Sequence, residues 1–153
     1  MNLAHKNQKK YSPVTAVYLH IPFCRHICPF CSFAVRRDRV DLHEKYILGM
    51  VDEIGRRVVW MEEKKQINSD VKLSGQKLLE SIYFGGGTPS SLKIPEAELL
   101  LSQVRNCFPS SDQIEISFEM NPEDVNQEYL SGLAEIGVTR VSLGGQSFQT
   151  LFT

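Results

Sequence analysis

The chain has 153 residues, of which 42 % are apolar and 23 % are charged, and its formal net charge is −1. This composition is typical of one folded domain with an apolar core, and it excludes an intrinsically disordered chain. The balanced charge argues against nucleic acid as a partner, and no apolar run approaches the roughly 20 residues that cross a bilayer.

The N-terminal segment, residues 1–13, is polar, and we expect it to be a tail that precedes a domain over residues 14–153. It lacks the apolar stretch of a secretory signal and the Arg- and Ser-rich composition of an organellar transit peptide. We therefore expect a cytoplasmic protein. Thiols stay reduced there, so closely spaced cysteines are interpreted as metal ligands before disulfides.

Short strands alternate with amphipathic helices along the chain. Residues 15–21 are expected to form a strand, which Pro22 closes. Asp41 and Glu44 resemble a capping box and predict the start of a helix. The polar stretch 62–75 is expected to be a loop or a frayed helix end. The apolar residues of this helix recur at helical spacing: Leu42, Tyr46, Met50, Ile54, Val58 and Met61.

Further strands are expected downstream, each followed by Gly or Pro. Between them, Pro95 suits the first turn of one helix, and Asp124 with Gln127 is expected to cap another, which Gly137 ends. This alternation implies right-handed βαβ units, and hence an α/β fold with a parallel sheet that its helices cover. The strands expected are 81–84, 114–119 and 139–143.

The strongest chemical signal is a group of three cysteines within eight residues: Cys24, Cys28 and Cys31. Structural zinc generally takes four ligands, and His20 or His26 can supply the fourth, so a zinc site is one alternative. An iron–sulfur cluster usually takes four cysteines. With three, one iron keeps an open position for an exchangeable ligand. We interpret the loop as the holder of a [4Fe–4S] cluster.

Residues 18–31 resemble the signature of the radical S-adenosylmethionine (SAM) superfamily. They are most similar to the branch that contains the oxygen-independent coproporphyrinogen III oxidases and the heme chaperone HemW. Every motif follows an expected strand, at the edge of the sheet where α/β barrels place their active sites. The resemblance implies the N-terminal half of a (β/α)6 radical SAM barrel, truncated after the fourth strand. It continues through residues 85–90, 119–122 and 142–148.

The resemblance also implies a set of SAM contacts. The amino and carboxylate groups of SAM would chelate the open iron, and one electron from a donor would cleave a sulfur–carbon bond of SAM to give a 5′-deoxyadenosyl radical. The aromatic residues Tyr18 and Phe30 are expected beside the iron. The backbone of Gly86, Gly87 and Thr88 is expected to approach the methionine part of SAM. The polar side chains of Glu119 and Gln146 are expected to contact SAM.

Two functions fit this resemblance: an oxidative decarboxylase of coproporphyrinogen III, and a chaperone that binds heme and transfers it to an unidentified acceptor protein. The oxidase branch typically carries a fourth cysteine two residues after the third. Phe33 occupies that position here, which favours the chaperone. The expected ligand is heme or a porphyrin, and no residue is assigned as catalytic.

Residues outside the motifs receive ordinary interpretations. Cys107 lies on an apolar helix and is expected to be a free cysteine of the core. Trp60 and Met61 are expected in the core or at its rim. His43 has no partner that the sequence identifies.

Overall fold

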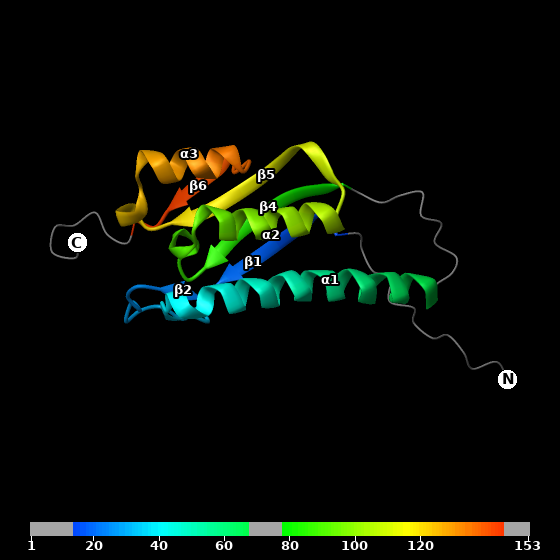
Figure 1. The fold of residues 1–153 in the computed structure, drawn as a ribbon, viewed down its shortest axis with the longest axis horizontal. Helices are drawn as coiled ribbons and strands as arrows, with labels where there is room; N and C mark the ends of the chain where they lie inside the picture. The colour runs from blue at the N-terminus through cyan, green and yellow to red at the C-terminus, as the bar shows by residue number, and fades with distance from the viewer. Residues whose placement is uncertain (1–13, 68–77, 146–153) are drawn as a thin grey trace.

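The computed structural model describes residues 14–67 and 78–145 (Figure 1). Four strands form one parallel sheet in the order β1-β4-β5-β6, and the strands run toward the same edge. The predicted α/β fold, a parallel sheet with flanking helices, is confirmed. The strands are β1 (Ala16–Ile21), β4 (Leu79–Gly86), β5 (Ser110–Met120) and β6 (Arg140–Leu143).

The helices that connect the strands begin and end at recognisable signals. Pro95 lies in the first turn of α2, where the backbone N–H of Lys93 donates to Glu96 Oε2 at 2.7 Å. Gly137 follows α3 with φ +95°, a conformation that glycine adopts without steric cost. The helices are α1 (His43–Ile67), α2 (Ile94–Cys107) and α3 (Gln127–Glu135), with short 3₁₀ turns η1 (Val40–Leu42), η2 (Pro89–Ser91) and η3 (Pro122–Asp124). Within the described ranges, no helix is long and apolar enough to cross a membrane.

The apolar face of the sheet forms the core. The register pairs Leu19 with Phe84 and Phe84 with Phe118, so that these buried side chains form a row across three strands. Alternate residues of a strand share a face, which explains why one face is uniformly apolar. Burial of each large side chain contributes about 1.5–3 kcal/mol. From the helices, the core includes Ile47, Ala97, Leu100, Leu101, Val104 and Leu133.

The opposite face of the sheet, which we call the polar face, is built from the intervening residues. The register pairs Tyr18 with Tyr83, Tyr83 with Ser117, and Ser117 with Arg140. Tyr18 is 57 % exposed. The helices were expected to cover the sheet, but the apolar face is the one against which they pack. The polar face therefore leaves functional groups accessible at the ends of the strands.

Two predicted helix starts are wrong. Asp41 lies within η1 and pairs with Arg39 at 2.7 Å, and α1 begins two residues later. The cap of α3 is Asn126, whose side chain accepts the Tyr129 N–H at 2.9 Å. The buried Asp124 carboxylate instead pairs with Arg25, whose side chain is half exposed. The polar stretch expected from residue 62 continues α1 as far as Ile67.

Two residues outside the motifs also differ from their sequence interpretation. His43 does have partners: its buried ring stacks on Phe23 with centroids 4.3 Å apart, and its Nε2 donates to Asp38 Oδ1 at 2.6 Å. Cys107 is only partly buried, and Gln103 Nε2 lies 3.5 Å from its sulfur, so it borders the core without belonging to it. Trp60 is exposed at the rim.

Candidate metal and cofactor site

The cysteine loop, residues 24–35, is closed at its neck by a pair of two-residue strands, β2 (Phe23–Cys24) and β3 (Arg36–Arg37). The Arg36 N–H donates to Pro22 O at 2.8 Å, and the Asp38 N–H donates to Cys24 O at 2.8 Å. His20 Nε2 also donates to Ala34 O at 2.8 Å. These bonds fix both ends of the loop at the edge where β1 ends (Figure 1).

The three cysteines of this loop differ in exposure. Cys24 is 8 % exposed at the neck, whereas Cys28 and Cys31 are partly exposed and joined by a turn in which the Cys31 N–H donates to Cys28 O at 3.0 Å. Burial raises the pKa of the Cys24 thiol, the Thr88 hydrogen bond lowers it, and the Cys31 and Cys28 thiols raise it further. Bound iron would offset the free-energy cost of deprotonating this buried thiol, because the thiolate is the form that binds metal.

The arrangement of the donors is compatible with a cluster. Among the described residues, no three His, Cys, Asp or Glu side chains converge as ligands of one metal ion. A [4Fe–4S] cluster does not require that, because each thiolate binds a different iron. His20, a candidate for the fourth zinc ligand, accepts from Tyr18 OH through Nδ1 and donates through Nε2. The three free thiols therefore fit a cluster better than zinc.

The glycine loop after β4 packs directly against Cys24. The Gly87 N–H donates to Ile21 O at 2.7 Å, and Thr88 Oγ1 donates to Cys24 Sγ at 3.5 Å. A Cβ on residue 87 would lie 2.9 Å from Cys24 Sγ and 2.8 Å from the Pro22 carbonyl carbon. Gly86 has φ +114°. Only glycine at both positions lets this backbone approach the cysteine loop so closely.

We predict that Gly87→Ala destabilises the fold by about 1–3 kcal/mol, because the added methyl meets backbone atoms that cannot move aside cheaply. Urea unfolding of the cluster-free protein measures the change. Gly49→Ala is the matched control: its Cβ meets nothing within 4 Å on α1, and alanine should stabilise that helix by up to about 1 kcal/mol. Equal stability of Gly87→Ala and the parent would show that the contact is not tight.

Glu119 lies at the end of β5 on the polar face. Tyr83 OH donates to Glu119 Oε1 at 2.7 Å, and the Tyr83 ring stacks on Tyr18 with centroids 6.0 Å apart. This hydrogen bond, followed by burial, raises the pKa of Tyr83. A Cβ on Gly85 would come within 3.1 Å of all three side chains. The Glu119 carboxylate is thus oriented by a hydrogen bond from Tyr83. The sequence did not identify Tyr83 as a site residue, because only the register of the strands brings it next to Glu119.

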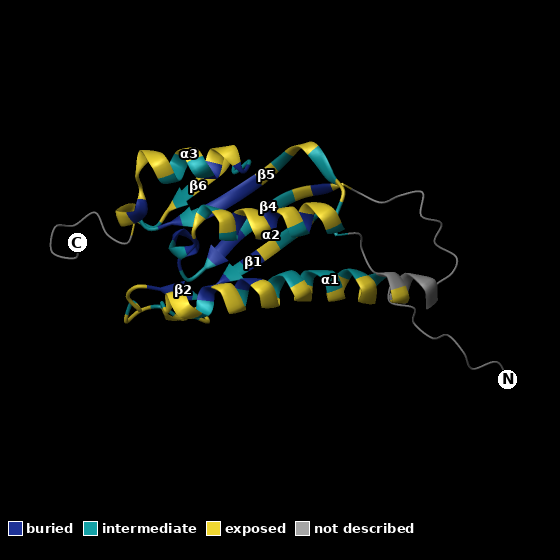
Figure 2. Cartoon of the chain, in the orientation of Figure 1, coloured by how far each residue is buried: buried dark blue, intermediate teal, exposed yellow. Residues whose placement is uncertain are grey.

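The remaining predicted site residues fall into two groups. Phe30 is 73 % exposed and Phe33 is 68 % exposed, and both lie on the cysteine loop, much of which is coloured exposed in Figure 2. The loop therefore presents apolar rings to the solvent around its thiols. Gln146 lies outside the described residues.

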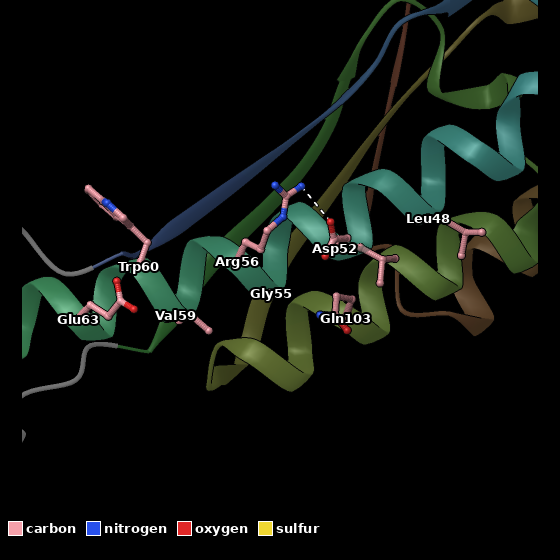
Figure 3. A pocket seen from close by; sticks show the side chains of 9 residues that line it. Leu48, Asp52, Gly55, Arg56, Val59, Trp60, Glu63 and Gln103 are labelled. Atoms are coloured by element: carbon pink, nitrogen blue, oxygen red, sulfur yellow. Dashed lines mark ion pairs between the residues drawn. The ribbon is translucent and has the colours of Figure 1, made fainter.

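A hollow of about 660 Å³ lies elsewhere, along α1 and α2 (Figure 3). It contains the exposed ion pair between Arg56 and Asp52, whose charged atoms are 2.9 Å apart. None of its lining residues comes from the cysteine loop or from the ends of the strands, so it is separate from the candidate site. The lining residues include Leu48, Val51, Gly55, Val59, Trp60 and Gln103.

Comparisons with known proteins agree with this geometry. The chain is 38 % identical over 137 residues to the heme chaperone HemW of Bacillus subtilis, a match that covers 88 % of this chain and 32 % of that protein. It is 28 % identical over 145 residues to the oxygen-independent coproporphyrinogen III oxidase of Synechocystis, covering 94 % and 28 % of the two chains. The solved coproporphyrinogen III oxidase HemN of Escherichia coli superposes with a TM-score of 0.72 at 28 % identity, covering 90 % of this chain and 29 % of that one.

The chain thus spans about a third of the length of the curated relatives that it matches. The family model of the radical SAM superfamily matches residues 18–152, which include the cysteine loop, the glycine loop and the strand ends described above. That family implies a [4Fe–4S] cluster and SAM as its cofactors. The chain belongs to the radical SAM superfamily and is related to the HemW heme chaperones and to HemN.

Proposed function

We propose that this chain is the cluster- and SAM-binding part of a HemW-like heme chaperone. The observation that carries the proposal is Phe33, an apolar ring that is 68 % exposed on the cysteine loop, at the position where the oxidase branch typically has a fourth cysteine. A thiol is absent there, and a flat aromatic surface is offered to the solvent. The higher identity to the Bacillus subtilis chaperone, 38 % against 28 % for the Synechocystis oxidase, supports the same assignment.

In this proposal Cys24, Cys28 and Cys31 hold the cluster. Cys24 is the buried anchor, because its sulfur accepts from Thr88 and packs under Gly87. When bound, the cluster and SAM supply one-electron radical chemistry, for which an electron donor is required. The protein's part is to hold the thiolates at the end of β1 and to orient the cofactors.

The SAM contacts proposed on the polar side are more open. Tyr18 lies in the middle of β1, Glu119 lies next to the last residue of β5, and Phe30 lies exposed on the cysteine loop. The Glu119 carboxylate, oriented by Tyr83, can accept hydrogen bonds from the ribose hydroxyls or the amino group of SAM. The backbone of Gly86, Gly87 and Thr88 can approach the methionine part, and Gln146 remains a proposed contact.

The alternative function is oxidative decarboxylation of coproporphyrinogen III. It is favoured by the structural match to HemN, which extends over 90 % of this chain. The two proposals share the cluster and SAM, and they differ in what happens to the porphyrin. A porphyrin ring can lie against Phe33 in either case, since stacking on an aromatic side chain needs no thiol.

Heme binding and decarboxylation are separable in one experiment on the intact protein. We expect about one heme per chain, seen as a Soret band, because an exposed aromatic loop offers a flat ring its apolar contact. We expect no conversion of coproporphyrinogen III under anaerobic, reducing conditions with SAM. Phe33→Ala should weaken heme binding, whereas Phe108→Ala, which removes a ring packed against the core, serves as the control for loss of stability.

Decarboxylation at a catalytic rate would contradict the chaperone assignment, whatever the heme result. Phe33→Cys then shows whether the position itself matters, because it introduces a fourth thiol without changing the rest of the loop. If that variant still binds heme as the parent does, the aromatic ring is not the contact.

A further inference from the structure

Three of the sequence motifs meet at one carboxylate, that of Asp124 in η3. The Asp124 side chain is 6 % exposed, and its Oδ1 lies 2.5 Å from Arg25 Nη2. Its Oδ2 accepts from Ser90 Oγ at 2.5 Å. Arg25 stands between Cys24 and Cys28 in the cysteine loop, and Ser90 belongs to the turn that follows the glycine loop. One buried charge therefore contacts both loops at once.

The polar groups around this carboxylate have hydrogen-bond or ion-pair partners. Ser90 Oγ, besides donating to Asp124, accepts the Asn121 N–H at 3.1 Å, so that the hydroxyl also holds the end of β5. The Asn126 side chain donates to the Asp124 carbonyl at 3.2 Å. A buried carboxylate without a cation or hydrogen-bond donors would be costly, and Arg25 and Ser90 together remove that cost. This use of Asp124 also explains why Asn126, and not Asp124, caps α3.

We propose that Asp124 is a positioning residue that, through Arg25 and Ser90, fixes the cysteine loop relative to the loops that follow β4 and β5. The inference rests on the proposed function, in which those loops hold the cluster and SAM. The neck bonds secure Cys24 and the segment 34–38, whereas Arg25 secures the part of the loop between the first two cysteines. We call these three side chains the Arg25–Asp124–Ser90 clamp.

The first arm of the test uses the intact protein with its cluster assembled. We expect iron release to a chelator to become about tenfold faster in Arg25→Gln and in Asp124→Asn, because either change leaves its partner without the ion pair. The double variant should be no faster than the single ones, since both remove the same interaction. Arg25→Lys keeps the charge and should stay within about threefold of the parent.

Arg39→Gln is the matched control. Arg39 lies close in sequence and pairs with Asp41, but both side chains are exposed, so its loss should leave iron release unchanged. Arg25→Gln should also lower the unfolding temperature, because it leaves the buried Asp124 carboxylate without its cation. Phe108→Ala, which destabilises the core away from the cysteine loop, separates positioning from general destabilisation, since it should not speed iron release. Iron release from Arg25→Gln at the parent's rate, or additive effects in the double variant, would overturn the proposal.

The second arm uses the cluster-free protein and follows amide hydrogen exchange of residues 25–31. Exchange should be faster in Arg25→Gln than in the parent and unchanged in Arg39→Gln, because the clamp exists without bound iron. If the parent assembles no cluster, the proposed function fails, and this arm still tests the clamp. Equal exchange in the parent and in Arg25→Gln would overturn the clamp while leaving the proposed function intact.

Discussion

Replacement of Cys24, Cys28 or Cys31 by Ala is expected to reduce bound iron from about four atoms per chain to almost none after anaerobic reconstitution with iron and sulfide. Only three thiols are available in the loop, so each loss leaves two ligands for the cluster. The brown colour, which arises from charge-transfer absorption in the visible range, should disappear with the iron. Cys24→Ala should in addition weaken the packing of the loop, because this buried thiol also accepts the Thr88 hydrogen bond.

Cys107→Ala is the internal control for this series. Its sulfur lies at the end of α2 and contacts Gln103, so its removal should leave the iron content unchanged. Iron and sulfide analysis beside absorption spectroscopy measures all four variants. Stoichiometric zinc without charge-transfer absorption, or undiminished iron in any variant of the three loop cysteines, would contradict the assignment of the ligands.

The second large effect concerns SAM. Glu119→Ala is expected to weaken SAM binding by about tenfold to a hundredfold, since a hydrogen bond to a charged group contributes roughly 1.5–3 kcal/mol. Tyr83→Phe removes only the donor that orients this carboxylate, so it should weaken binding by less than Glu119→Ala, by about threefold to tenfold. Titration of the reconstituted protein with SAM measures both affinities.

Tyr129→Phe is a suitable control for the tyrosine change, because Tyr129 OH donates to Leu92 O away from the polar face. It removes a phenolic hydroxyl of the same kind and should leave SAM affinity unchanged. If Glu119→Ala binds SAM as tightly as the parent, the carboxylate is not a contact. If Tyr83→Phe has the larger effect, the tyrosine acts directly and not through Glu119.

The fold was predictable from the sequence because its signals are local. Local signals indicate where single elements begin or end: the β-rich run for β1, Pro95 for the first turn of α2, and Gly137 for the end of α3. The alternation of strands and helices then implies a parallel sheet. The extent of β5 was not predictable. Its first residues, from Ser110, are polar and join the sheet only because Ser110 pairs with Leu79 across an irregular register.

From the residues alone, the site was predictable only where its chemistry lies within one loop, and Tyr18 and Glu119 were expected only through the family resemblance. The three cysteines and the glycine loop are each contiguous in the sequence, whereas Tyr83 with Glu119 and Arg25 with Asp124 are brought together by strand order. Asp124 illustrates the limit: its type and position indicate a helix cap, yet in the folded chain its buried carboxylate pairs with Arg25. His43 is similar, since Asp38 and Phe23 surround it only in the folded chain.

The central claim is that three thiolates of this chain hold a [4Fe–4S] cluster with one iron open to SAM. Electron paramagnetic resonance of the reduced, reconstituted protein tests it most directly. We predict the signal of a reduced [4Fe–4S] cluster whose g-values shift when SAM is added, because SAM binds at the iron that no cysteine occupies. A cluster signal that is identical with and without saturating SAM would contradict the account.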